Sequence, residues 1–164
     1  TSMSIDHTLQ LLEAYVISEK VVSSFANFDD PTLAVELESF QSNYEKVSDQ
    51  RNLLKITEIN GKFHNRLAES TGNQFIVANS ADLHNLARRL SYFVYRMESK
   101  NSVKLNKHLK RINKDHRTII QLIKTRDRQQ LVRHCTEHAL LFKKQLRKVV
   151  GRDDFFELDF LNLN

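Results

Sequence analysis

The sequence predicts an all-α protein, folded as a bundle of six or seven helices. Only three of the 164 residues are glycine and one is proline, while leucine, lysine, arginine, glutamate and glutamine recur throughout, so helix propensity is high nearly everywhere. Apolar residues recur at intervals of three to five, close to the period of a helix that buries one face. A chain of this length supports one domain with a sizeable core, and we expect antiparallel packing wherever two helices are joined by a short connection.

The first three helices are marked by apolar patterns and by their end signals. An apolar stripe through residues 5–28 predicts the first helix. Asp30 and Pro31 predict the start of the second, because a carboxylate caps free amide groups and the N–H that proline lacks would have no partner in the first turn. A third helix begins near Leu53 and ends just before Gly72, which suits the left-handed conformation that follows many helices.

A long helical pattern occupies the middle of the chain. It runs through residues 73–109, and we expect it to break near Asn101. Asn113 is then expected to cap a short helix, because asparagine side chains accept hydrogen bonds from the free amides of a first turn. This interpretation places His116 in the first turn of that short helix.

The last helix is predicted from a capping signal, and the two ends of the chain differ from the rest. Asp127 and Gln130 resemble a capping box, which predicts a helix from this point to Gly151. Residues 152–164 interleave large apolar side chains with four acidic residues, so we expect this extension to pack on its own bundle or on a partner subunit. Residues 1–4 look like a cloning remnant ahead of the native start.

The charge, the cysteine content and the lack of long apolar runs limit which partners and which compartment the sequence indicates. The formal net charge of +5 is scattered over helical patterns and is not gathered in one basic block, so direct contact with nucleic acid is not indicated. The single cysteine, Cys135, excludes an internal disulfide and favours a reducing compartment. No apolar run approaches the length needed to cross a bilayer and no signal-peptide pattern opens the chain, so we expect a cytoplasmic protein without membrane contact.

Four polar residues stand at spacings that a helical bundle can bring to one point. Asn60 and His64 lie one helical turn apart, and His116 and His138 follow on two later helical segments. Neutral imidazole is the commonest protein ligand for zinc and related divalent metals, so the pattern indicates a metal centre. The other four histidines are expected to lie outside this centre as solvated or hydrogen-bonded side chains; they are His7, His84, His108 and His134.

The context of these histidines resembles a known family. Residues 60–64 read N-G-K-F-H and are followed by T-G-N at residues 71–73, which resembles the "D-x-x-F-H … G-N" signature of the FCD domain. Residues 115–120 read D-H-R-T-I-I, and a histidine follows twenty-two residues after His116, which resembles the family's "E-H-x-x-I … D … H". The FCD domain is the C-terminal effector domain of the FadR branch of GntR-type bacterial transcription regulators. The resemblance covers residues 8–149.

The resemblance implies a helical bundle around a cavity. In many family members the cavity holds a divalent metal, bound by an acidic residue and three histidines, beside a small carboxylate effector. Carried over to this chain, His64, His116 and His138 match the three imidazole ligands, and Asn60 stands where the family usually has aspartate. An amide oxygen can coordinate a metal but lacks the negative charge, so metal affinity should drop. Zinc or nickel is the expected ion.

The effector's polar anchor is expected on the first or the fourth helix. The family's first helix often presents an arginine and a glutamate to the core, and Ser18 and Val22 are expected at those places here. Among the arginines of the long fourth helix, Arg88, Arg89 and Arg96, we prefer Arg89 as the residue that binds the effector. A guanidinium group can pair with a carboxylate through two parallel hydrogen bonds.

Regulators of this type carry a winged helix-turn-helix domain ahead of the effector domain. Nothing before Asp6 supplies it, so DNA contacts are expected through a domain outside this chain, and residues 5–151 are expected to form the effector-binding domain. The resemblance also implies a homodimer, with the first and fourth helices as expected contributors. Effector binding would then shift the population between bundle arrangements and so control how the dimer holds DNA.

Two alternatives remain open at this point. Three histidines around zinc with an open position can also build a hydrolase or lyase site, although the chain has no H-E-x-x-H arrangement, and we expect no enzyme. The second alternative is a metal-free bundle that binds a larger apolar ligand of the acyl type. The histidines argue against this alternative, while Asn60 argues mildly for it.

Overall fold

The computed structural model describes residues 5–150, and this part of the chain is an all-α bundle of six helices. The prediction of an all-α fold with six or seven helices is therefore confirmed. The helices are α1 (Ile5–Phe25), α2 (Leu33–Asp49), α3 (Leu53–Glu69), α4 (Gln74–Ser99), α5 (Ser102–Lys124) and α6 (Arg128–Val150). Residues 1–4 and 151–164, and with them the expectations about both ends of the chain, lie outside the described residues.

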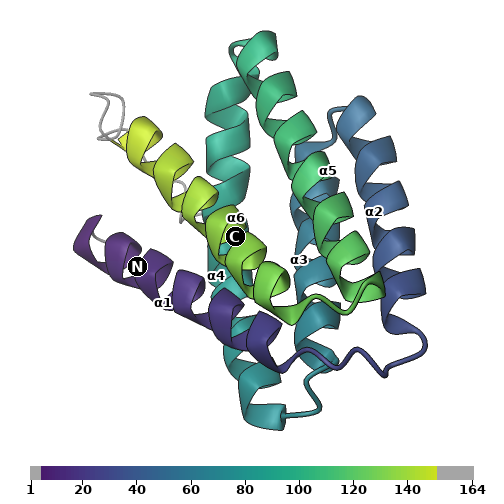
Figure 1. The fold of residues 1–164 in the computed structure, drawn as a ribbon. Coiled ribbons are helices and arrows are strands. Elements are labelled where there is room, and N and C mark those ends of the chain that lie inside the picture. The colour runs from purple at the N-terminus through teal and green to yellow at the C-terminus, as the bar shows by residue number, and fades with distance from the viewer. Residues whose placement is uncertain (1–4, 151–164) are drawn as a thin grey trace.

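From α2 to α6 each helix packs against the next one in the chain, whereas α1 packs on α6 and α4 and not on α2 (Figure 1). α3 lies between α2 and α4, and α5 packs on α2 and α6. α4 and α5 form a long hairpin whose tip is at the top of Figure 1, and α6 returns across the front of the bundle. Among residues 5–150, no helix combines the length and apolarity needed to span a bilayer.

Side-chain caps define several helix boundaries, as the sequence predicts. The Asn101 carboxamide oxygen accepts hydrogen bonds from the backbone N–H groups of Val103 and Lys104 at 3.1 and 3.2 Å, which separates α5 from α4. Asp127 accepts from the backbone N–H of Gln130 at 3.1 Å at the start of α6. Gly72 adopts a φ of 64° between α3 and α4, where a side chain would strain the backbone.

The predicted helix start at Asn113 is wrong. α5 runs without interruption through this residue, because its apolar stripe continues on both sides, from Leu105 to Ile123. The Asn113 side chain instead accepts a hydrogen bond from Gln41 Nε2 at 2.9 Å and joins α5 to α2. His116 therefore lies in the middle of α5 and not in a first turn. Smaller differences occur near residue 30, where α1 ends at Phe25 and α2 begins at Leu33.

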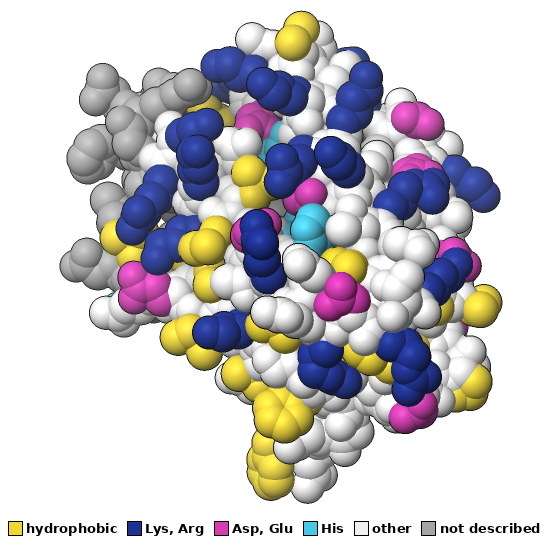
Figure 2. All heavy atoms as spheres, viewed as in Figure 1, with side chains coloured by type: hydrophobic (Ala, Val, Ile, Leu, Met, Phe, Trp, Pro, Cys, Tyr) yellow, Lys and Arg dark blue, Asp and Glu magenta, His cyan; other side chains and the backbone are white. Residues whose placement is uncertain are grey.

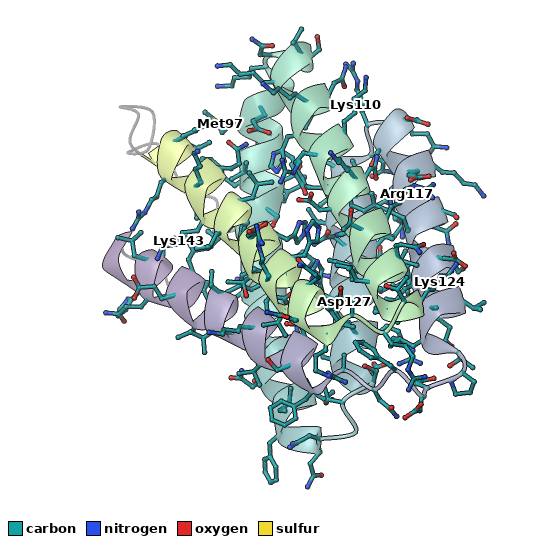
Figure 3. All side chains as sticks on the ribbon, in the orientation of Figure 1. Met97, Lys110, Arg117, Lys124, Asp127 and Lys143 are labelled. Atoms are coloured by element: carbon teal, nitrogen blue, oxygen red, sulfur yellow. The ribbon has the colours of Figure 1, made fainter. Side chains whose placement is uncertain are left out.

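The core consists of apolar clusters separated by a band of buried polar side chains. One apolar cluster surrounds Leu37 and Ile119, a second surrounds Leu12 and Leu90, and a third surrounds Tyr44. The buried polar band lies between them and includes Glu19, Gln41, His64, His84, Asp115, His116 and His138. By contrast, Arg117 and Lys124 project from α5 toward α2, where they pair with Glu45 and Glu38 (Figure 3).

Arg128 ties the start of α6 to the end of α1. Its guanidinium donates to the backbone carbonyls of Ser24 at 2.7 Å and Ala26 at 2.8 Å, and it lies 4.4 Å from the centre of the Phe28 ring. These carbonyls belong to the last turn of α1 and to the residues after it, so helical hydrogen bonds do not satisfy them. The contact therefore fixes the angle between two helices that carry site residues.

We expect Arg128→Ala to lower the free energy of unfolding by about 1–2 kcal/mol, because it removes charge-assisted hydrogen bonds at a partly exposed helix end. Urea denaturation followed by circular dichroism measures this. The matched control is Arg133→Ala on the same helix, which loses only an exposed pair with Glu137 and should change stability by less than about 0.5 kcal/mol. Equal effects of the two substitutions would contradict the assigned role of Arg128.

Candidate metal centre

Three imidazole rings converge in the middle of the bundle. His64 comes from α3, His116 from α5 and His138 from α6, and all three are buried. One ring nitrogen of each lies within 4.8 Å of those of the other two, and the ring centres are 5.2 to 5.5 Å apart. Three ligands from three helices at this separation can surround a single divalent ion after small side-chain adjustments.

Each of the three rings is oriented by a hydrogen bond on its outer nitrogen, Nδ1. The acceptors are Glu19 Oε2 for His64 (2.9 Å), Gln41 Oε1 for His116 (2.8 Å) and Asp115 Oδ2 for His138 (3.1 Å). An Nδ1–H that donates to such an acceptor leaves the lone pair of the neutral imidazole on Nε2. Carboxylate and amide acceptors behind the ring are typical of histidines that bind metals through the opposite nitrogen.

Two of the three inner nitrogens lack hydrogen-bond partners. His64 Nε2 and His116 Nε2 are fully buried and make no hydrogen bond within the described residues. The carboxamide oxygen of Asn60, one helical turn before His64, is buried and unpartnered in the same way. A buried polar atom without a partner costs about 1–3 kcal/mol, so three of them on one turn of α3 and the facing helix require an explanation. All three atoms are electron-pair donors of the kind that a cation would satisfy.

A small cavity lies beside the rings. It has a volume of about 30 Å³, and Asn60 and His138 contribute to its wall together with Tyr15, Tyr95 and His108. This volume admits one or two water-sized groups. It does not admit an organic acid with several carbon atoms in the arrangement seen here.

Comparison with known protein families gives a match to the FCD domain, over residues 12–140. The matched segment is well over half of the chain and contains all three converging histidines. This chain belongs to the FCD domain family. FCD domains are regulatory, ligand-sensing domains, and the chain is accordingly an effector-binding domain of the GntR type of regulator. Neither the comparison with curated proteins nor that with solved structures gave a match.

The FCD domain contains a buried glutamate that was not among the residues expected from the sequence. Ser18 and Val22 of α1 are buried, and so is Glu19, which is 1% exposed and bonds both His64 and His84. Val22 packs in an apolar cluster, and Ser18 is a neighbour of Asn79. The sequence signal was present: Glu19 falls within the buried stripe of α1, where an unpaired charge would be costly.

His84 also belongs to the centre, although the sequence analysis placed it outside. Its Nε2 lies 2.8 Å from Glu19 Oε1, and its ring stacks on that of His64 with 4.8 Å between centres. Glu19, His64 and His84 form a second group of potential ligand atoms within 4.8 Å. Both Glu19 oxygens are already engaged by imidazole nitrogens, so we assign this group to orienting His64 and not to a second ion. Burial opposes the charge on Glu19, but His64 and then His84 outweigh it and lower its pKa.

Two imidazoles at the centre, those of His116 and His138, are held neutral. Burial lowers the pKa of His116 well below its usual value, and the neighbouring rings of His138 and His64 add to this effect. Burial also lowers the pKa of His138, although the hydrogen bond to Asp115 acts in the opposite direction. Neutral imidazole is the form that binds a metal, so protons do not compete for these nitrogens near pH 7.

The expected role of Arg89 is not supported by its position. Arg88, Arg89 and Arg96 are all exposed on α4, whose buried face carries His84 and Leu90 instead. Helical spacing places Arg89 on one face with Phe75, Leu86 and Phe93; Phe75 and Leu86 are 77% and 41% exposed, while Phe93 is buried. The exposed position of Arg89 does not support a contact with the small cavity, and its role in binding an effector stays a prediction.

We expect the metal-free FCD domain to lose stability as the pH falls below about 6.5, the ordinary pKa of histidine. His116 and His138 bind protons less readily in the folded than in the unfolded chain, so folding becomes less favourable by up to about 1.4 kcal/mol per pH unit for each. Above this pH both states carry neutral rings and the contribution vanishes. Urea unfolding with a chelator at pH 5.5, 6.5 and 7.5 measures the slope.

His116→Gln should reduce the slope of stability against pH, since glutamine does not titrate and only the contribution of His138 remains. His7→Gln, which changes an exposed histidine on α1, is the matched control and should retain it. Glu19 and Asp115, whose pKa values are lowered, act in the same direction only below about pH 4. An unchanged slope in His116→Gln would contradict the assignment of a buried neutral ring.

Proposed function

We propose that this FCD domain senses a small carboxylate effector through a divalent metal ion held by His64, His116 and His138, with the Asn60 oxygen as a fourth ligand. The observation that carries the proposal is that all three rings are hydrogen-bonded through Nδ1, while Nε2 of His64 and of His116 is buried and unpartnered. Zinc or nickel suits a site of imidazoles and one amide oxygen. When bound, the ion supplies a fixed positive charge that can accept an effector carboxylate.

The charge arrangement favours an anionic effector. All four proposed ligands are neutral, while the carboxylates of Glu19 and Asp115 lie behind the rings and accept hydrogen bonds from them. The charge of a divalent ion would thus be compensated only by carboxylates that do not contact it and act through the histidine rings. An anionic effector that binds the open side of the ion would supply the missing negative charge. In a site with aspartate in place of Asn60, part of that compensation would come from the protein.

Effector binding would require the bundle to adjust. The cavity of about 30 Å³ is walled by Tyr15 of α1, Tyr95 of α4 and Phe142 of α6, so a larger ligand must displace side chains from these helices. A ligand that binds an expanded arrangement better than the compact one shifts the population toward it. This supplies the conformational change by which a sensor domain would control a DNA-binding domain outside this chain.

We further propose that the domain acts as a homodimer through α1 and α4. Both helices expose large apolar side chains: Ile17 and Phe25 on α1 are each 63% exposed, and Phe75 on α4 is 77% exposed. Figure 2 shows hydrophobic side chains gathered at the lower end of the molecule, over the beginning of α4. Exposed apolar surface of this kind is typical of regions that contact another subunit.

Sensing is favoured over the two alternatives by specific contacts. A hydrolase or lyase needs a free general base near the ion, whereas both oxygens of Glu19 are bonded to histidines. An acyl ligand needs a long apolar cavity, whereas the space beside the rings holds one or two water-sized groups. The metal-free alternative also leaves the unpartnered Nε2 atoms of His64 and His116 unexplained.

We expect the purified protein to bind close to one zinc or nickel ion per chain. His64→Ala and His116→Ala should each reduce the bound metal by at least tenfold after dialysis, because two neutral ligands and an amide seldom retain a divalent ion. Native mass spectrometry and elemental analysis measure the stoichiometry, and His7→Ala is the control that should retain full occupancy. A wild-type protein that stays free of metal when zinc and nickel are supplied would overturn the proposal.

Asn60→Asp should strengthen metal binding by about tenfold or more, because it replaces a neutral oxygen by a charged one at the same distance from His64. Asn60→Ala should weaken binding by a smaller factor than any histidine substitution. Competition with a chromophoric chelator gives the affinities. If Asn60→Asp leaves the affinity unchanged while the histidine variants lose the metal, the three rings hold the ion and Asn60 is not a ligand.

A further inference from the structure

A second, larger cleft lies near the tip of the α4–α5 hairpin, between α5 and the end of α6. Its volume is about 670 Å³, within the range of small-molecule sites. Five cationic side chains line it: Lys100, Lys104, Lys107, Arg111 and Lys148. Figure 2 shows dark blue side chains over the upper part of the molecule, where the tip of the α4–α5 hairpin and the end of α6 lie.

The positive charge of the cleft is almost uncompensated. One carboxylate lines it, that of Glu98, and this group is bonded to His108 Nδ1 at 2.6 Å. Arg111 is paired with Asp115 at 2.9 Å on its own helix. Within residues 7–149, the four lysines of the cleft form no ion pair, whereas Arg117, Lys124 and Lys143 each pair with a carboxylate of a neighbouring helix. Like charges held together in a concave surface repel one another, and they raise the local concentration of anions.

The cleft differs from an ordinary basic surface because it has a defined shape. Lys104, Lys107 and Arg111 recur at three- and four-residue intervals on α5 and so form one stripe along its wall. Leu141 and Val149 of α6 form an apolar part of the lining. An apolar wall with several convergent charged groups is the usual composition of a site for a small organic anion.

We propose that this cleft is a second ligand site, which binds a small polyanion through its phosphate or carboxylate groups. It is separate from the imidazole centre and does not require a metal. His108 and Leu141 line both this cleft and the small cavity beside His138, so the two sites share a wall. A ligand in the cleft would contact α5 and α6, the two helices that carry His116 and His138.

Isothermal titration of the full chain with inorganic pyrophosphate, at low ionic strength and after chelator treatment and dialysis, tests the proposal. We expect one site per chain. Lys104→Ala/Lys107→Ala should weaken its affinity by about tenfold or more, because two direct charge-assisted contacts are lost. Lys110→Ala/Lys114→Ala removes the same charge from exposed positions of α5 outside the cleft and should change the affinity by less than about threefold.

Three results would overturn the proposal. Equal weakening in both double variants would show a general charge effect. Absence of binding both in the wild-type chain and after the acidic side chains of residues 153–159 are neutralised would show that the cleft is no site for polyanions. Binding that appears only after the acidic side chains at Asp153, Asp154, Glu157 and Asp159 are neutralised to their amides would show that the chain's own acidic segment is the anion. Because the protein is metal-free throughout, none of these results depends on the outcome at the imidazole centre.

Discussion

The requirement that buried polar groups find partners determines how this bundle is assembled. Three imidazoles meet in the interior, and each needs an acceptor behind it in a medium where an unsatisfied donor is costly. The acceptors come from α1 (Glu19), α2 (Gln41) and α5 (Asp115), and the rings come from α3, α5 and α6. Since α4 adds His84, all six helices are tied to one small volume. A shift of any helix by one turn would leave at least one buried group without its partner.

This requirement also explains which features the sequence could predict. The helix caps at Asn101 and Asp127 involve residues at most three positions apart, so the sequence predicts them. The spacing of Asn60 and His64 by one helical turn is equally local and is predicted in the same way. The role of Asn113 depends on Gln41, 72 residues away, and its side chain is as suitable for a cap as for a helix interior. Local preference therefore gave the wrong answer there, because the apolar stripe of α5 continues through Asn113 and its side chain bonds to Gln41 instead of capping a helix.

The position of Arg89 shows why the buried face of a helix is harder to predict than the helix itself. The extent of α4 follows from its helical pattern, but the choice of its buried face does not. On α4, Phe75 and Leu86 suggested a buried stripe, yet both are exposed, and the buried stripe runs through His84 and Leu90. A helix that keeps apolar residues on two faces has no unique inward direction, and only the packing of its neighbours selects one.

The position of α6 connects the two sites with the surface of the bundle. His138 and Leu141 lie one turn apart on this helix, so a displacement that opens the small cavity also changes the wall of the basic cleft. α6 packs on α1, and α1 in turn exposes Ile17 and Phe25. Packed helices move as units because their interiors are dense and deform little. Occupancy at either site would thus reach the proposed dimer surface through the contact between α6 and α1, without a continuous chain of polar groups between them.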